Sequence, residues 1–391
     1  MMDAKRTIRG YLRENGRYGI RNYLAVIPTS VCSSETAQRI ARLVPGSVAL
    51  PHQHGCCHVG DDYKQMLRTL IGLGSNPNVG AVLVVGLGCE GIQPADVTNA
   101  IIETGKAVET IIIQDCGGTL GAIEKGARMA GQMMQTLSNM EKVPFDVGEL
   151  ILGLECGGSD PTSGIASNPA LGVASDMLVN AGGTSVLSET TELIGAEHIL
   201  AKRAVSHAVA EELLRIVKQT EQRAVDMGVD LRGSQPTPGN IEGGLTTIEE
   251  KSLGCIYKAG NAPVEGVIDY GEEVPLHKGL YVMDTPGQDI DSITGMLAGG
   301  ATIIVFTTGR GTPTGSPIAP VIKVTGNSST FEKMKDNIDI NAGRIIDEGA
   351  SIDEIGKEIF EEMVRVANGK LTKAEVLGHG EFGIFRIGFT F

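Results

Sequence analysis

Residues 81–87 read AVLVVGL, a continuous apolar run that is typical of a β-strand buried on both faces. Outward from it, residues 23–28 and 110–114 predict two more strands in the first third of the chain. Apolar residues at helical spacing separate these strands over residues 33–44 and 120–137. Strands that alternate with helices predict βαβ units, a parallel sheet and a Rossmann-like three-layer α/β domain.

The pattern restarts after a proline-containing link near residues 142–149. The second part contains further predicted strands at 150–154, 184–187, 280–284 and 301–307 and predicted helices at 172–180, 199–228 and 351–368. A chain of 391 residues also exceeds what one hydrophobic core usually organises. We therefore expect two α/β domains, a Rossmann-like one over residues 1–145 and a catalytic one over residues 146–391.

The composition narrows the class of partner and the compartment. The net charge of −14 disfavours nucleic acid, because phosphate binding needs concentrated lysine and arginine. The chain begins without an apolar signal segment and has no run of about 18 apolar residues, so we expect a cytoplasmic protein that does not span a membrane. Seven cysteines, an odd number, then indicate reduced thiols rather than a disulfide framework.

Three predicted strands each place a cysteine just past the carboxyl end, at Cys32, Cys89 and Cys156. Ligands bind outside the carboxyl ends of parallel strands, so these thiols could converge on iron, as a single ion or an iron–sulfur cluster. The alternative is that they are small buried hydrophobic residues, as many cysteines are. No C-x-x-C pair decides between the two.

Residues 51–58 read PHQHGCCH, with three imidazoles and two thiols. This density favours metal ligation or proton transfer, but the spacing does not match a structural zinc motif, so a polar surface loop is equally consistent. The glycine-rich loops, such as residues 116–119 and 239–244, match neither a Walker A motif nor a dinucleotide fingerprint. They predict a site for an anion such as a carboxylate, without a nucleotide cofactor.

Several motifs together resemble the altronate/galactarate dehydratase family of sugar-acid hydro-lyases, and the resemblance runs nearly end to end. The motifs that carry it are GYLRENGRYGIRN (10–22), PHQHGCC (51–57), LECGGSDPTSGIASNP (154–169), PGNIEGGLTTIEEKSLG (238–254), FTTGRG (306–311) and GHGEF (378–382). The resemblance implies dehydration of an aldonic or aldaric acid to a 2-keto-3-deoxy acid, assisted by divalent iron. Such an elimination starts with removal of a proton next to a carboxylate, which cations or a metal must stabilise.

The positions of the motifs assign roles to individual residues. The implied iron ligands are Cys32, His52, Cys56, Cys89 and Cys156, with Glu90 adjacent. The implied catalytic groups are Lys251, as base or carboxylate ligand, and Glu189, Glu192 and His198, with Glu197 beside them. The implied substrate-binding groups are Arg21 and Arg310 for the carboxylate and Asp160, Asn168, Asn240 and Thr308 for hydroxyls.

The same family implies a partner and an alternative reaction. Full-length members carry a small N-terminal β-rich domain that this chain lacks, so we expect that domain as a separate subunit of an oligomeric enzyme. The large subunit of sulfolactate sulfo-lyase is also similar, at residues 234–254, and it eliminates sulfite instead of water. The presence of Cys32 and Cys89 favours the dehydratase. A non-catalytic acid-binding or scaffold subunit is the third hypothesis.

Overall fold

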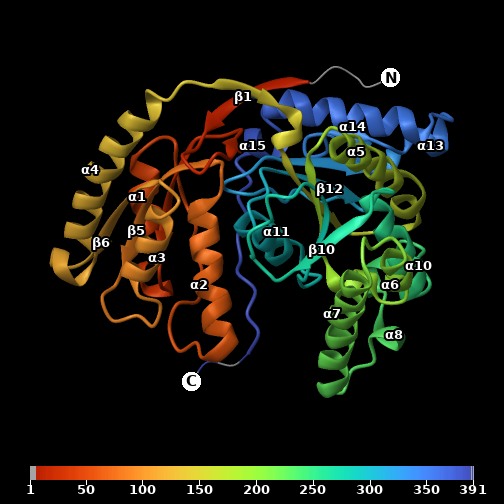
Figure 1. Ribbon diagram of the computed structural model, residues 1–391, viewed down its shortest axis with the longest axis horizontal. Coiled ribbons are helices and arrows are strands. Elements are labelled where there is room, and N and C mark those ends of the chain that lie inside the picture. The colour runs from red at the N-terminus through yellow and green to blue at the C-terminus, as the bar shows by residue number, and fades with distance from the viewer. Residues whose placement is uncertain (1–5, 389, 391) are drawn as a thin grey trace.

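The computed structural model describes residues 6–388 and residue 390. Two layered α/β units lie side by side, with helix α2 and the C-terminal segment running between them (Figure 1). Each unit is built on a parallel sheet, and a small antiparallel sheet of order β2-β1-β7 joins the N-terminal segment to the link between the units. The predicted fold class, α/β with parallel sheets, is confirmed. Among the described residues, no helix is long and apolar enough to cross a membrane.

The first unit has a four-stranded parallel sheet of order β4-β3-β5-β6. Its strands are β3 (Tyr23–Pro28), β4 (Ser47–Ala49), β5 (Val79–Gly86) and β6 (Ala107–Ile112), and its helices are α1 (Val31–Leu43), α2 (Gly60–Ser75), α3 (Pro94–Ile102) and α4 (Thr119–Ser138). Alternate residues of β3 serve opposite faces, because strand side chains alternate. Leu24 and Val26 pack into the apolar cluster with α1 and α4, and Ala25 and Ile27 pack into the cluster with α2 and α3.

The second unit has a seven-stranded parallel sheet of order β10-β11-β9-β8-β12-β13-β14. Its strands are β8 (Ile151–Gly157), β9 (Thr184–Leu187), β10 (Val264–Ile268), β11 (Gly279–Met283), β12 (Ile303–Thr308), β13 (Val321–Thr325) and β14 (Ile340–Asn341). Its helices are α5 (Asn168–Asn180), α6 (Glu197–Ala201), α7 (His207–Asp226), α8 (Leu231–Ser234), α9 (Pro238–Glu242), α10 (Ile248–Ile256), α11 (Asp289–Ala298), α12 (Ser328–Lys333), α13 (Arg344–Asp347), α14 (Ile352–Ala367) and α15 (Lys373–Leu377). β8, at the centre, is buried along its whole length.

The small sheet consists of β1 (Thr7–Leu12), β2 (Tyr18–Gly19) and β7 (Val143–Asp146). β1 pairs with both of the others, and all of these pairs are antiparallel. The proline-containing link between the units is therefore an ordered strand that is hydrogen-bonded to the start of the chain.

The two units meet where α2 packs against α11. A side chain at Gly72 would clash with a backbone carbonyl of α11, so the two helices approach at the distance that glycine permits. Beside this contact, the Asn76 side chain donates to the carbonyls of Leu297 and Ala301, at 2.8 and 2.9 Å. The junction therefore combines apolar packing with buried hydrogen bonds.

The helix predicted over residues 199–228 is wrong in one respect, because the chain forms two helices, α6 and α7, with a break at residues 202–206. In the break, Ala204 forms a parallel bridge with Val264 at the start of β10. Ser206 then begins α7, since its side chain accepts the backbone N–H of Val209 at 3.3 Å. Tertiary pairing with a strand overrides the helical spacing of the apolar residues here.

Candidate active site

The order of the seven-stranded sheet reverses between β8 and β12, and this is where open α/β sheets bind ligands. Cys156 is the penultimate residue of β8, and the neighbouring β9 is followed directly by the segment that contains Glu189 and Glu192. Lys251 of α10 and Lys258 of the adjoining 3₁₀ helix Tyr257–Ala259 reach the same point. We call these five residues the lysine–carboxylate cluster.

Two ion pairs organise the lysine–carboxylate cluster. Lys251 Nζ lies 2.8 Å from Glu192 Oε1, and Lys258 Nζ lies 2.7 Å from Glu189 Oε2, with both side chains of the second pair fully buried. Burial would raise the pKa of Glu192, but Lys251 and Lys258 lower it to about 2. Burial would lower the pKa of Lys251, but Glu192 raises it above its ordinary value. Lys251 is therefore a cation at neutral pH, which argues against the prediction that it is the base.

Cys156 connects the two carboxylates. Its backbone N–H donates to Glu189 Oε2 at 3.1 Å, and its thiol donates to Glu192 Oε2 at 2.9 Å. The sulfur of Cys255 lies 3.9 Å away. The hydrogen bond with Cys255 and burial both raise the pKa of Cys156, so this residue is a neutral thiol.

A second set of carboxyl groups adjoins the first at Glu189. Ligand atoms of Glu155, Glu189 and Asp289 lie within 4.8 Å of one another. Glu155 is fully buried and accepts hydrogen bonds from the hydroxyls of Ser188 and Ser292, at 3.1 and 2.7 Å. Burial and the neighbouring Glu189 raise the pKa of Glu155 well above its usual range, so Glu155 holds a proton.

Two further features mark these carboxyl groups as functional. Burial, and then the charges of Glu189 and Glu192, raise the pKa of Asp289 to about 7, where a carboxylate exchanges protons readily at neutral pH. Glu189 has a φ of +65°, in the left-handed region that residues other than glycine rarely adopt. Backbone strain of this kind gathers at active sites.

A cavity of about 470 Å³ opens beside Lys251. The polar side chains along it include the hydroxyls of Ser159, Ser163 and Thr247 and the amide of Asn168. Among the described residues that line it, Lys251 is the only cation. The lining also carries the carboxyl groups of Asp160, Glu249 and Glu250. A cavity of this size that adjoins groups with perturbed pKa values is typical of an enzyme active site.

Two of the predicted substrate-binding residues, Asp160 and Asn168, line this cavity, whereas Asn240 and Thr308 are not among its lining residues. Asn168 donates to the Gly254 carbonyl at 2.9 Å and accepts from the Thr307 hydroxyl at 2.5 Å. Asp160, which lines the cavity, accepts from the Thr162 hydroxyl at 2.5 Å. The remaining two act on backbone groups: Asn240 donates to the Ser159 carbonyl at 2.8 Å, and the Thr308 hydroxyl accepts the Gly311 N–H at 2.9 Å.

Three other predicted residues are not brought into the lysine–carboxylate cluster. Arg310 is exposed and donates to the Gly239 carbonyl and to Glu242, at 2.7 and 3.0 Å. His198 is exposed on α6, and its neighbour Glu197 accepts the Gly195 N–H at 2.5 Å.

Arg21 lies at the amino end of the four-stranded sheet, opposite to the edge where ligands bind. It pairs through two nitrogens with Glu375, at 2.7 and 2.9 Å, and also donates to three backbone carbonyls. The Nε, Nη1 and Nη2 groups of Arg21 thus all donate hydrogen bonds to protein acceptors. The structure thus gives Arg21 a part in joining the first unit to α14 and α15.

The predicted thiol centre of Cys32, Cys89 and Cys156 needs correction. Cys32 and Cys89 lie at the carboxyl edge of the four-stranded sheet, whereas Cys156 lies at that of the seven-stranded sheet. Within the described part of the chain, two groups of ligand atoms lie close enough to hold a metal ion, namely Cys156, Glu189, Glu192 and Cys255, and the set of Glu155, Glu189 and Asp289. The three predicted thiols are not in one group, because their strands belong to different sheets.

The histidines of residues 51–58 are engaged in hydrogen bonds. His52 Nε2 pairs with the Pro28 carbonyl at 2.7 Å, while its Nδ1 accepts the His54 N–H at 3.2 Å. His54 Nε2 pairs with the Ile384 carbonyl at 2.9 Å, and His58 pairs with Asp62. Burial lowers the pKa of His52 to about 4, so its ring is neutral. Both of its nitrogens are occupied, so His52 does not offer a lone pair to a metal.

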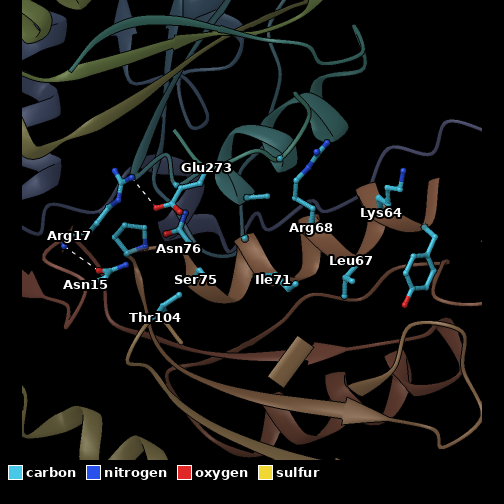
Figure 2. A pocket seen from close by; sticks show the side chains of 16 residues that line it. Asn15, Arg17, Lys64, Leu67, Arg68, Ile71, Ser75, Asn76, Thr104 and Glu273 are labelled. Carbon is cyan, nitrogen blue, oxygen red and sulfur yellow. Dashed lines mark hydrogen bonds and ion pairs between the residues drawn. The ribbon is translucent and has the colours of Figure 1, made fainter. Parts of the chain in front are cut away.

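A second cavity, of about 410 Å³, lies at the junction of the two units along α2 (Figure 2). Its charged side chains pair with one another or with neighbours, as Arg17 does with Glu273 at 2.9 Å and Arg68 with Asp269 at 3.5 Å. None of the residues predicted for the site lines it. We therefore place the active site at the cavity beside Lys251.

The sequence analysis missed Glu155, Lys258, Cys255 and Asp289. Glu155 left a signal, because it is a charged residue inside an otherwise apolar predicted strand. Asp289 follows the MDTPG segment, residues 283–287, at the start of a helix. Nothing in the local sequence marks Lys258, which becomes distinctive only through its burial against Glu189.

Two family models match the chain in succession. The model of the second domain of D-galactarate dehydratase/altronate hydrolase matches residues 10–138, and the C-terminal model of D-galactarate/altronate dehydratase matches residues 147–390. The fold and the site thus define a lyase built on two α/β units. The chain belongs to the D-galactarate/altronate dehydratase family, which confirms the resemblance seen in the sequence.

Named relatives cover nearly the whole chain. The chain is 40% identical to the (2R)-sulfolactate sulfo-lyase subunit beta of Chromohalobacter salexigens, over 98% of both chains. It is 35% identical to the altronate dehydratase of Bacillus subtilis and 36% identical to that of Escherichia coli, in each case over 99% of this chain and 79% of the relative.

Proposed function

We propose that this chain is the catalytic chain of a sugar-acid dehydratase, which converts an aldonic or aldaric acid into a 2-keto-3-deoxy acid. One observation carries the proposal: the cavity beside the lysine–carboxylate cluster is lined by one cation, Lys251, by hydroxyl and amide groups, and by the carboxyl groups of Asp160, Glu249 and Glu250. A sugar acid has one carboxylate at the reacting end and hydroxyls along its length. The lining supplies hydrogen-bond partners for both kinds of group.

Lys251 binds the substrate carboxylate in this proposal. Its side chain is 14% exposed beside the cavity, while Glu192 keeps it charged. Removal of the α-proton moves negative charge onto that carboxylate, and a fixed ammonium group stabilises this charge best in a site that excludes water. Lys258, which is fully buried and paired with Glu189, adds a second positive charge to the lysine–carboxylate cluster.

Asp289, which does not line the cavity but lies beside Glu189 of the lysine–carboxylate cluster, is the base that we favour. With a pKa of about 7, it is substantially ionised at neutral pH, yet it is a stronger base than an exposed aspartate. It takes the proton from the carbon next to the carboxylate and returns it to the β-hydroxyl as the C–O bond breaks. Water leaves, the enol product rearranges to the 2-keto acid, and Asp289 is again a carboxylate.

We place no metal in the lysine–carboxylate cluster. The charges of Glu189 and Glu192 are matched by those of Lys258 and Lys251, and the thiol of Cys156 is protonated, so the cluster is electrically balanced as it stands. The resemblance implies iron as a cofactor of the family. When bound, iron supplies Lewis-acid or redox character that side chains alone lack.

Elimination of sulfite is the second candidate function, supported by the match over nearly full length to the sulfo-lyase subunit. A sulfolactate carries two anionic ends, as an aldaric acid does, whereas an aldonic acid carries one. Among the described residues that line the cavity, Lys251 is the only cation, which favours an aldonic acid over both. We therefore rank dehydration of an aldonic acid first.

We also propose a separate, smaller partner chain. The relative that matches over 98% of both chains is named as subunit beta, that is, as one chain of an assembly, and this supports the proposal.

Turnover of three acids tests the function. The chain, purified with a co-expressed partner, is incubated with altronate, galactarate and sulfolactate, and the release of 2-keto acid and of sulfite is measured. We expect 2-keto acid without sulfite from one of the sugar acids. Lys251→Ala should abolish it, whereas Lys278→Ala, which removes a lysine paired with Glu149 instead, should not. Sulfite release from sulfolactate alone would establish the second candidate.

A further inference from the structure

The cavity at the junction of the two units, drawn in Figure 2, is separate from the proposed active site. It measures about 410 Å³ and shares no lining residue with the cavity beside Lys251. Its lining includes Ile71 of α2, Ala298 of α11 and Arg17 of the turn between β1 and β2. Cavities of this size at the border between domains are typical sites for small molecules. We call it the junction cavity.

The turn between β1 and β2 holds Arg17 at one end of the junction cavity (Figure 2). Gly16 has a φ of +81°, in the left-handed region, and the Arg13 N–H donates to the Arg17 carbonyl at 2.9 Å. The Arg17 N–H donates to the Asn15 side chain at 3.2 Å. Arg17 belongs to the motif GYLRENGRYGIRN, residues 10–22, which contributes nothing to the lysine–carboxylate cluster.

The Arg17 guanidinium is only partly used by the protein. Its Nη2 donates to Glu273 at 2.9 Å and to the Val274 carbonyl at 2.7 Å, and no described residue accepts from its Nε or Nη1. The nearby Arg13 and Arg21 differ, because each of them donates through Nε, Nη1 and Nη2. The Arg17 side chain is 12% exposed, so its remaining donors lie where charge-assisted hydrogen bonds are strong.

Glu273 shows which chemical group Arg17 binds. It is the only carboxylate among the described residues that line the junction cavity, and its side chain is 71% exposed. Exposed ion pairs contribute little, so the carboxylate of a ligand can replace Glu273 on Arg17. A smaller cavity of about 230 Å³ shares Asn15, Arg17 and Pro77 with the junction cavity. Arg17 thus borders two cavities.

Two further cations line the junction cavity along α2. Lys64 is 75% exposed and lies 2.9 Å from Asp61, and Arg68 is 36% exposed and lies 3.5 Å from Asp269. Their carboxylate partners lie outside the lining, and water screens both pairs. The described lining therefore holds three cations and one carboxylate, in a chain with a net charge of −14. This balance favours an anionic ligand, with Arg17 as its most shielded partner.

The lining between these charged groups is apolar. Leu67 and Ile71 lie four residues apart on α2, so they share one face, and both are half-buried (Figure 2). Ala298 lines the same cavity from the second unit. The hydroxyl of Thr104 and the amide of Asn76 donate to backbone carbonyls at 2.7–2.9 Å, so the protein already uses them. This part of the lining suits an apolar group rather than a row of hydroxyls.

We propose that the junction cavity binds a small carboxylate with an apolar body, such as an aryl-substituted acid, through Arg17. The ligand carboxylate takes the place of Glu273, and the apolar body lies along Leu67 and Ile71. Because both units contribute to the lining, the ligand binds the arrangement of units seen here and stabilises their junction. The junction cavity is therefore an effector site, and it goes beyond the proposed dehydration without depending on it.

Titration calorimetry with three probes tests the proposal. Phenylacetate has the carboxylate and the apolar ring, phenylacetamide has the ring without the charge, and acetate has the charge without the ring. We expect phenylacetate to bind about tenfold more tightly than either control, because it alone makes the charge-assisted hydrogen bonds and buries the ring. Equal binding of phenylacetate and phenylacetamide would overturn the role of Arg17 as a carboxylate ligand.

Three variants locate the bound probe. Arg17→Gln should weaken the binding of phenylacetate by about tenfold or more, because a neutral amide replaces the charged fork. Glu273→Gln should tighten it several-fold, because it removes the competing carboxylate. Lys251→Ala, in the other cavity, should leave it unchanged. Unchanged binding by Arg17→Gln, weaker binding by Glu273→Gln, or a loss in Lys251→Ala would each overturn the proposal.

Thermal unfolding of the wild-type chain gives a reading that does not depend on any variant folding. Phenylacetate should raise the melting temperature of the wild-type chain more than phenylacetamide does at the same concentration. No shift and no heat of binding with phenylacetate would overturn the proposal. None of these measurements involves turnover, so failure of the proposed function would leave this test intact.

Discussion

Replacing Lys258 by methionine removes one partner of a fully buried ion pair and keeps most of the volume of the side chain. The Lys258 ammonium lies 2.7 Å from Glu189, and both side chains have no exposed surface. Loss of one partner of such a pair leaves an uncompensated buried charge, which costs about 3–5 kcal/mol. We expect Lys258→Met to lower the free energy of unfolding by this amount at neutral pH.

The matched control is Arg39→Ala, which removes an exposed pair on α1. Arg39 lies 2.8 Å from Glu35, and both side chains are more than half exposed. An exposed pair contributes little to stability, so Lys258→Met should cost several times more than Arg39→Ala. Denaturant unfolding followed by circular dichroism measures both. A cost for Lys258→Met no larger than that of Arg39→Ala would refute the argument.

The pH dependence gives the sign of the effect independently. Without Lys258, burial raises the pKa of Glu189 in the folded state above its value in the unfolded state. The folded variant then binds a proton more tightly than the unfolded chain, so its deficit relative to wild type shrinks as the pH falls. The double variant Lys258→Met/Glu189→Gln, which has no buried charge at this position, should recover part of the loss at neutral pH. A deficit that grows on acidification would contradict this account.

Three further predictions follow from the same structure. Asp289→Asn should lower turnover by about 10²–10⁴-fold. It should also remove the rise in the wild-type rate as the pH increases through about 7, because only the ionised base accepts a proton. An unchanged pH–rate profile would exclude Asp289 as the base. Arg21→Met leaves Glu375 as a buried, unpaired charge. The substitution should therefore lower the free energy of unfolding by about 3–5 kcal/mol, measured by denaturant unfolding, while KM stays constant. A raised KM in folded protein would instead support a contact between Arg21 and the substrate. Gly72→Ala should destabilise the chain by about 1–3 kcal/mol because the new methyl group meets a carbonyl of α11. Gly131→Ala, in a helix with open space around it, should stabilise by up to about 1 kcal/mol, and equal melting temperatures for the two alanine variants would show that α2 and α11 do not approach as described.

Local sequence determined the elements of the fold. The AVLVVGL run is buried on both faces because it pairs on two sides and is covered by helices on both, and it forms most of β5. The break between α6 and α7 escaped prediction, because it depends on the pairing of Ala204 with Val264, sixty residues away in the chain. Hydrophobic periodicity and helix propensity are properties of one local segment, whereas this helix break depends on pairing with a residue far away in the sequence.

For the site, the sequence by itself determined which residue types follow which strands. It placed Cys156, Glu189, Glu192 and Lys251 in loops at carboxyl ends or on nearby helices, and the structure brings these four together. The protonation states of these side chains depend on the tertiary structure. Lys251 is a cation because Glu192 faces it in a buried position, so the proton stays on the lysine.

Only the tertiary structure decided which groups share a site. Cys32 and Cys156 follow strands of the same kind, yet they lie on two different sheets, because strand order is set by long-range pairing rather than by local pattern. Arg21 meets Glu375 across 354 residues of chain for the same reason. Asp289 gains its raised pKa from burial and from the nearby carboxylates of Glu189 and Glu192, which lie in the segment after β9. Burial and charge proximity are properties of the packed molecule, and no stretch of sequence contains them.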